Sequence, residues 1–199
     1  MRLVSPRLPR SFFVRDPVVV ARDLLGRILF YQSAGGLIAG RIVETEAYTG
    51  QADPASHAYR GPTARNQVMF GPAGIAYVYF SYGMHHCLNV TADISGSAGA
   101  VLLRALEPLA GQALIQARGN RGPDHRLLSG PGKIGRGFGL TLADNGRDLT
   151  RGKLGIAAGL PTADQEVAIT PRIGITRGAE SPYRFSVRSS RSVSGRSSR

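Results

Sequence analysis

The chain has one cysteine, two lysines and no long apolar run. Each of these shortages excludes a class of protein or of functional site. Cys87 by itself excludes an intrachain disulfide and a metal site built from several cysteines. No run of eighteen apolar residues is present, and the N-terminus lacks an apolar segment followed by a small-residue cleavage site. We therefore expect a cytoplasmic protein that does not span a membrane.

Several common catalytic motifs are also missing. The sequence has no glycine-rich phosphate loop ending in lysine, no dinucleotide fingerprint after a strand and no GxSxG turn. His85, His86 and Cys87 are neighbours, but adjacent residues of a strand point to opposite faces, so these three cannot share one ion. We therefore expect neither a metal site nor a cofactor.

Acidic residues are scarce relative to basic ones. The chain has 25 basic and 13 acidic residues, which give a net charge of +12. Since Lys133 and Lys153 are the only lysines, nearly all of this charge is arginine, whose planar fork suits phosphate groups. Two explanations stay open, a polyanionic partner or a general arginine bias with a basic tail. The tail from Arg184 onward holds five arginines and no acid, so it supplies only part of the charge.

Apolar periodicity and turn residues predict a single α+β domain with a curved, mostly antiparallel β-sheet and a few peripheral helices. Asp16 followed by Pro17 predicts the start of a helix that ends at Gly26. Further short helices are expected from Pro108 to Ala117 and within residues 131–140. Strands are expected at residues 27–32, 36–48, 75–82, 85–93, 100–108, 153–159, 165–170, 172–176 and 183–188.

The expected domain occupies residues 16–188. An irregular lead-in at residues 1–15 precedes it, and a basic, low-complexity tail at residues 189–199 follows, which we expect to be disordered. Residues 49–74 form a long loop with three prolines, four glycines and little periodicity. A loop of that length inside a compact domain is usually functional.

The strand RIVETEAY places two carboxylates, Glu44 and Glu46, on one face together with Tyr48. Carboxylates are depleted in strands and costly to bury without partners. Either the two glutamates face water or pair with arginines, or one of them is a general base in a pocket walled by aromatic rings. The stretch IAYVYFSYGM favours the second alternative, because it concentrates four aromatic residues and points Tyr77 and Tyr79 to the same side.

Seven separated blocks together resemble the alkyladenine (3-methyladenine) DNA glycosylase family in its bacterial form. They are RIVETEAY, the loop residue His57, the pair Arg65-Asn66, YVYFSYGMHHCLNV, VLLRALEP, GPGK and PRIGI, in the family's order. The resemblance implies a monofunctional enzyme that flips alkylated or deaminated purines out of double-stranded DNA and hydrolyses the N-glycosidic bond. The implied substrates are 3-methyladenine, 7-methylguanine, hypoxanthine and ethenoadenine. It also implies a monomer associated with the nucleoid.

The resemblance also assigns residue roles. For catalysis it implies Glu46 as the base that activates water and Arg104 as the residue that helps place this water and the glutamate. It also implies a catalytic part for the backbone carbonyl of Ile173. The implied base-binding residues are Tyr48, His57, Tyr79 and Asn89. The implied DNA contacts are the wedge Tyr82, which would fill the gap left by the flipped base, together with Met84, His85, Arg65 and Lys133. Glu44 is expected to be structural and paired with an arginine.

Two other hypotheses belong to different classes. A non-enzymatic nucleic-acid-binding protein could use the tyrosines to stack on bases and the arginines to follow the backbone. A hydrolase of free nucleosides would act on mononucleosides without regard to salt. A glycosylase instead predicts duplex binding that weakens steeply as salt rises.

Overall fold

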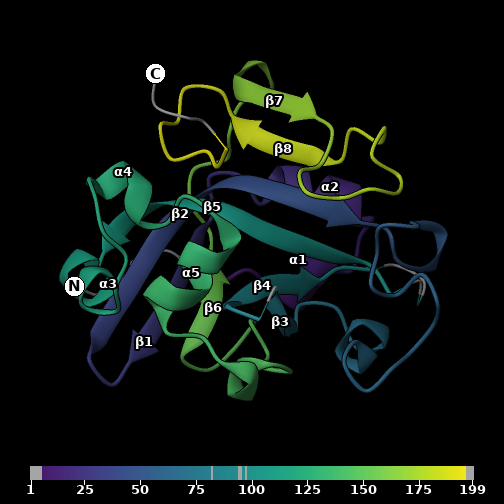
Figure 1. Cartoon of the computed structure of the whole chain (residues 1–199), viewed down its shortest axis with the longest axis horizontal. Helices are drawn as coiled ribbons and strands as arrows, with labels where there is room; N and C mark the ends of the chain where they lie inside the picture. The colour runs from purple at the N-terminus through teal and green to yellow at the C-terminus, as the bar shows by residue number, and fades with distance from the viewer. Residues whose placement is uncertain (1–5, 82, 94–95, 97, 196–199) are drawn as a thin grey trace.

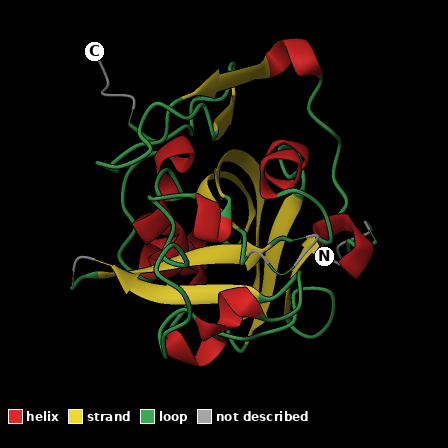
Figure 2. Ribbon diagram, turned by 90° about the vertical axis from the view of Figure 1, so that its right-hand side faces the viewer, coloured by secondary structure: helices red, strands yellow, loops and turns green. Residues whose placement is uncertain are grey.

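The computed structural model describes residues 6–81, 83–93, 96 and 98–195. It confirms a single α+β domain, with eight described strands in one sheet whose pairings are all antiparallel. Figure 2 shows the strands curving through the middle of the molecule, with short helices around them. The strands are β1 (Ile28–Ser33), β2 (Gly36–Tyr48), β3 (Ala76–Ser81), β4 (His85–Thr91), β5 (Ala100–Ala110), β6 (Leu154–Ala157), β7 (Val167–Thr170) and β8 (Arg184–Val187). The helices are α1 (Arg10–Phe13), α2 (Pro17–Asp23), α3 (Gln112–Ala117), α4 (Asp124–Leu127) and α5 (Pro131–Phe138). Short 3-10 turns lie at Gly50–Ala52, Gln67–Phe70, Leu142–Asp144 and Asp164–Glu166.

Strand β2 is the centre of the sheet. The main order is β3-β4-β5-β2-β1-β6, while β7 and β8 form a small pair that joins at β2 (Figure 1). One edge of β2 is shared, because residues 36–41 pair with β1 and residues 44–46 pair with β8. Its other edge pairs with β5 through several register shifts, which are typical of a bent strand. The end of β2 that carries the two glutamates therefore lies where β5 and β8 meet it.

The two faces of β2 have different neighbours. Thr45 donates a hydrogen bond of 2.7 Å from its hydroxyl to the carbonyl of Ala21 in α2, so this face lies against that helix. Because side chains alternate along a strand, Glu44 and Glu46 point away from α2. Helix α5 packs on β4 and β5. Apolar side chains from strands and helices, such as Leu24, Leu103 and Phe138, form one large buried core.

The start of α2 follows the prediction. The Asp16 side chain accepts a hydrogen bond of 2.7 Å from the Val18 N–H, and Pro17 occupies the first helical turn. The hairpin of β1 and β2 is also confirmed, with Ser33 paired to Gly36 at its tip.

The predicted start of one helix and one predicted strand are wrong, although the helix itself is present as α3. Pro108 does not begin a helix, since β5 continues to Ala110 and Gly111, with φ of +81°, turns the chain into α3. Residues 172–176 are not a strand, and the one backbone N–H of this segment with a described partner bonds a side chain instead of a neighbouring strand. The Ile173 N–H donates to Glu46, and the Arg172 side chain turns back to bond Asp53.

Both ends of the described chain differ from the expected lead-in and disordered tail. Leu8 and Phe13 are buried in the main core. Ser192 and Val193 are buried as well, and the Ser194 N–H donates a hydrogen bond of 2.6 Å to Glu44. The tail composition suggested disorder, but a buried carboxylate offers this segment specific hydrogen bonds. Its last four residues lie outside the described part.

None of the described helices is both long enough and apolar enough to cross a membrane.

Candidate active site

A cavity of about 500 Å³ opens beside the end of β2. This volume lies within the range of roughly 300–1,000 Å³ that small-molecule sites occupy. Strands β2 to β5, the loop at residues 49–74 and the segment around Ile173 all contribute to it. Seven of the residues to which the family resemblance assigns a role line it, namely Tyr48, His57, Arg65, Tyr79, Asn89, Arg104 and Ile173.

Aromatic rings form one wall of this pocket. The rings of His57 and Tyr79 meet edge to face, with centroids 4.6 Å apart and planes at 84°. Tyr77 and Tyr79 are tilted neighbours at 5.4 Å, as the period-two pattern predicted. The Nδ1 atom of His57 lies 2.9 Å from the Tyr77 hydroxyl oxygen, which fixes the imidazole ring. Electron-rich rings in such an arrangement can stack on a planar or cationic base.

Glu46 lies directly behind the pocket and is fully buried. Its Oε2 accepts hydrogen bonds from the Tyr48 hydroxyl at 2.9 Å and from Nη1 of Arg104 at 3.2 Å. Its Oε1 accepts a bond of 2.8 Å from the backbone N–H of Ile173. Three residues that line the pocket therefore hold one carboxylate. The contact from Ile173 is made by its N–H group, whereas the resemblance assigns a role to its carbonyl.

Arg104 joins Glu46 to the second carboxylate. Its Nε lies 3.1 Å from Oε1 of Glu44, which is also fully buried and accepts a 2.6 Å bond from Nε of Arg184. The expected pairing of Glu44 with an arginine is thus confirmed, with two arginines instead of one. Two carboxylates and two guanidinium groups balance in charge, which makes their burial tolerable.

Proton affinities in this cluster follow from its charges. Burial raises the pKa of Tyr48, and the charge of Glu46 and the hydrogen bond to it raise it further. The Tyr48 hydroxyl therefore remains a donor. Burial alone would lower the pKa of Arg104, but the charges of Glu46 and Glu44 outweigh this effect and raise it. The guanidinium thus keeps its charge beside the pocket.

His57 has the opposite tendency. Packing against the tyrosines lowers the pKa of His57, and the positive charge of Arg65 lowers it further, although the residue remains exposed at the pocket rim. The imidazole is therefore neutral at pH 7. A neutral ring can stack on a cationic base without repelling it.

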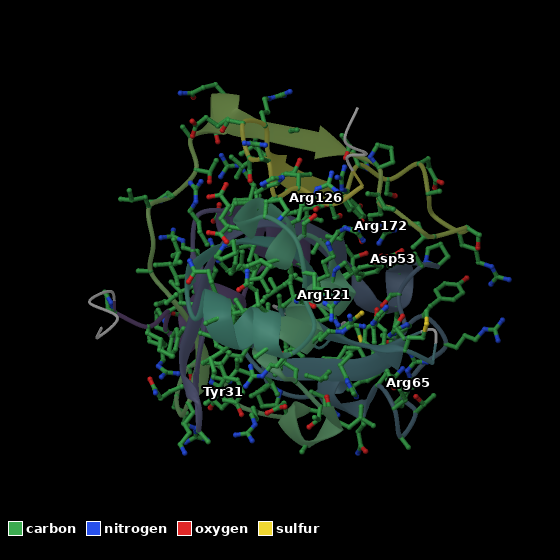
Figure 3. All side chains as sticks on the ribbon, turned by 60° about the vertical axis from the view of Figure 1, so that its left-hand side comes forward. Tyr31, Asp53, Arg65, Arg121, Arg126 and Arg172 are labelled. Atoms are coloured by element: carbon green, nitrogen blue, oxygen red, sulfur yellow. The ribbon has the colours of Figure 1, made fainter. Side chains whose placement is uncertain are left out.

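Sequence inspection missed the support behind Tyr48. The guanidinium of Arg172 lies 4.7 Å from the Tyr48 ring centroid and 5.3 Å from that of Tyr183. It also donates 2.9 Å hydrogen bonds to Oδ1 of Asp53 and to the carbonyl of Ala47. Figure 3 shows Arg172 and Asp53 together near the end of the sheet. Nothing in the sequence links these two residues, which stand 119 positions apart.

The proposed DNA contacts are less uniform. Met84 is 68% exposed, as a surface contact requires, whereas His85 packs against Gly132 at the start of α5. The Lys133 ammonium donates a hydrogen bond of 2.9 Å to the carbonyl of Arg126. The guanidinium of Arg65 lies 5.1 Å from the centroid of the Tyr79 ring, and Arg65 lines the pocket. Tyr82 lies outside the described residues. Among the residues that the structure describes, no cluster of three or more His, Cys, Asp or Glu side chains could hold a metal ion.

Comparison with known proteins supplies the family. Residues 11–191 match the family model of methylpurine-DNA glycosylase. The chain belongs to this family. It is therefore a DNA glycosylase, a hydrolase of N-glycosyl bonds that takes DNA as its substrate. The family resemblance inferred from the sequence is confirmed, and the hypotheses of a non-enzymatic binding protein and of a nucleoside hydrolase are set aside.

Individual relatives agree with the family model. A protein of Carboxydothermus hydrogenoformans is 51% identical over 94% of this chain and 98% of its own length. One from Rhodopseudomonas palustris is 48% identical over 96% of this chain and 89% of its own length. One from Methanoculleus marisnigri is also 48% identical, over 95% of this chain and 99% of its own length. All three carry the name "Putative 3-methyladenine DNA glycosylase".

Proposed function

We propose that this glycosylase removes alkylated purines, 3-methyladenine first among them, from double-stranded DNA as a monomer, with Glu46 as the base that activates water. The observation that carries this proposal is the position of Glu46, a fully buried carboxylate that Tyr48, Arg104 and Ile173 hold at the back of an aromatic pocket. A carboxylate in this position can take a proton from water and stabilise positive charge that develops on the sugar.

The pocket supports base flipping. A base inside a duplex cannot reach a buried carboxylate unless its nucleotide leaves the stack. A flipped purine would enter the cavity between Tyr48 and the pair of His57 and Tyr79. Stacking of a base on an aromatic ring is worth about 1–3 kcal/mol. Asn89, which lines the pocket and donates 3.2 Å to the carbonyl of Tyr77, would contact the purine edge and discriminate against the amino group of guanine.

The hydrogen bonds of Glu46 leave room for the attacking water. Each carboxylate oxygen can accept two hydrogen bonds. Within the described residues, Oε1 accepts one, from the Ile173 N–H, so a second acceptor position remains for water. Ile173 is 41% exposed and lines the pocket, so water in the pocket lies beside the residue that holds Oε1. The water would attack C1′ while the base departs.

The neutral imidazole of His57 fits alkylated substrates. Alkylation at N3 or N7 makes the purine cationic, so the base leaves as a neutral molecule and needs no general acid. The lowered pKa of His57 agrees with this, because a neutral imidazole is a poor proton donor. Hypoxanthine and ethenoadenine, which leave less easily, are expected to be slower substrates.

Single-turnover release of free base tests the proposal. The substrates are a duplex treated with a methylating agent and a duplex carrying one hypoxanthine, each incubated with excess wild type or Glu46→Gln. We expect wild type to release methylated purines, and Glu46→Gln to bind the duplex but release none. Release by both proteins would remove Glu46 from the mechanism. Release of hypoxanthine alone would reject alkylated purines as the substrate.

A further inference from the structure

The last described residues of the chain reach the back of the active site. We propose that Ser194, which lies in this C-terminal strap (residues 190–195), is a positioning residue for Arg104 and, through it, for Glu46. This inference rests on the proposed role of Glu46. The match to the family model covers residues 11–191, and Ser194 lies three residues past its end.

Ser194 donates two hydrogen bonds to Glu44, the carboxylate that Arg104 links to Glu46. Its N–H donates a hydrogen bond of 2.6 Å to Oε2 of Glu44, and its hydroxyl donates one of 2.9 Å to Oε1 of the same residue. Glu44 has no exposed surface, so every hydrogen bond that it lacks would leave a buried charge short of a donor. The strap therefore supplies two of the contacts that keep Glu44 charged and in place.

The same hydroxyl fixes the guanidinium directly. Nη2 of Arg104 donates 3.2 Å to the Ser194 hydroxyl oxygen, Nε donates to Glu44, and Nη1 donates to Glu46. Each nitrogen of the guanidinium thus has its own partner, and a planar group held at three points cannot rotate. Loss of the Ser194 hydroxyl would free one of these points and allow the nitrogen that faces Glu46 to move.

A second contact ties the strap to the other support of Glu46. A β-carbon added to Gly195 would lie 3.6 Å from Cδ1 of Ile173, so the strap packs beside the residue whose N–H holds Oε1. Arg184, which bonds Glu44, also approaches the Ser194 carbonyl at 3.5 Å. The strap consequently touches Ile173, which holds Glu46, and Arg184, which holds Glu44.

Burial shows that the strap is seated in the fold. Ser190, Ser192, Val193 and Ser194 are all buried, and the Ser190 hydroxyl donates 2.6 Å to Glu107. A segment rich in serine and arginine gains little from apolar burial, which leaves hydrogen bonds to Glu44 and Glu107 as its specific anchors.

Ser192 provides a matched control. It stands in the same strap and is fully buried, but within the described residues its hydroxyl oxygen has no hydrogen-bond partner. Ser194→Ala and Ser192→Ala therefore remove the same atom from the same segment, and only the first removes contacts to Glu44 and Arg104. A general loss of packing would affect both variants, while a positioning role would affect one.

The experiment measures single-turnover release of methylated purines at increasing enzyme concentration, which separates the maximal rate from the half-saturating concentration. We expect Ser194→Ala to lower the maximal rate roughly 10- to 100-fold, the size of effect that a small misplacement of a catalytic group produces. The half-saturating concentration should stay near that of wild type, while the thermal unfolding midpoint should fall, because Glu44 loses one donor to a buried charge. Ser192→Ala should match wild type in all three measurements.

Truncations and Glu46→Gln complete the test. A chain ending at Gly195 should keep the wild-type rate, and one ending at Ser190 should be at least as slow as Ser194→Ala. Equal rates for Ser194→Ala and wild type, with Glu46→Gln inactive, would overturn the role of Ser194 and leave the proposed function intact. Parallel losses of rate and of thermal stability in both serine variants would also overturn it. An active Glu46→Gln would remove the proposed base and the strap's role with it.

Discussion

The guanidinium carbon of Arg172 lies 4.7 Å from the centroid of the Tyr48 ring, while its terminal nitrogens donate to the buried carboxylate of Asp53. The three residues come from a strand, a loop and a segment far along the chain. Together they brace the aromatic ring that stands next to the proposed base, Glu46. The rigidity of the pocket therefore depends on an ion pair that does not itself line the cavity.

Breaking this ion pair should cost stability. Arg172→Met leaves Asp53 buried without its charge partner, and we expect a loss of about 3–5 kcal/mol in the free energy of unfolding. Adding Asp53→Asn removes the unpaired charge, so the double variant should recover part of this loss. Urea-induced unfolding of both single variants and of the double variant measures the coupling. Losses that simply add would show that the two residues stabilise the fold independently.

Arg104 should resist replacement even by lysine. Arg104→Lys keeps the positive charge, but a single ammonium cannot reach Glu44, Glu46 and Ser194 from three fixed directions. We expect the single-turnover rate to fall roughly 10- to 100-fold.

Arg184→Lys is the matched control for that change. Arg184 also pairs with Glu44, but it is absent from the pocket lining. It faces Glu46 across the β2–β8 pairing, yet the described donors to the Glu46 carboxylate are Tyr48, Arg104 and the Ile173 N–H. Its replacement should therefore reduce the rate less than Arg104→Lys does. Equal reductions would mean that the charge balance of the cluster matters and the geometry of Arg104 does not.

His57 should make stability depend on pH in a defined direction. Packing against the tyrosines and the charge of Arg65 lower its pKa below 6.5 in the folded protein. As pH falls through 6.5, the unfolded chain takes up a proton on this residue and the folded protein does not. The stability that neutral His57 contributes is therefore complete above pH 6.5 and is lost as pH falls toward the folded pKa. Water at the exposed rim reduces the size of this effect.

The measurement compares wild type with His57→Gln. Unfolding free energies at pH 7.5 and pH 5.5 should differ more in wild type than in the variant, which lacks the titrating ring. An NMR titration of the imidazole checks the sign directly. A midpoint at or above pH 6.5 would contradict the assigned shift.

The enzyme should leave an abasic product without cutting the strand. Cleavage by a lyase needs an amine nucleophile. The two lysines of the chain are Lys133 and Lys153, and neither is among the residues that line the pocket. We expect borohydride to trap no covalent adduct between protein and damaged duplex, as judged by denaturing electrophoresis. A trapped adduct that disappears in Lys133→Arg would identify that residue as an unexpected nucleophile.

The sequence predicted most of the sheet because each strand follows a local rule. Glu44 and Glu46 share one face of their strand, and Tyr77 and Tyr79 share one face of theirs, because a strand has a two-residue period. Asp16 caps its helix through contacts that span only three residues. The predictions failed where distant groups compete with local preference. Ile173 was expected in a strand, but a carboxylate 127 positions away binds its N–H.

By itself, the sequence determined that this chain is a basic α+β protein of the glycosylase family, because motifs and strand periods are encoded over a few residues each. Through the family resemblance that its motifs carry, it also implied Glu46 as the base. Only the tertiary structure decided how that glutamate is held. The supports of Glu46 and of its neighbour Glu44 include Arg104, Ile173 and Ser194, and the Ser194 contact joins residues 150 positions apart. Contacts of that range leave no periodic trace in a sequence, since they depend on how the folded sheet brings its distant ends together.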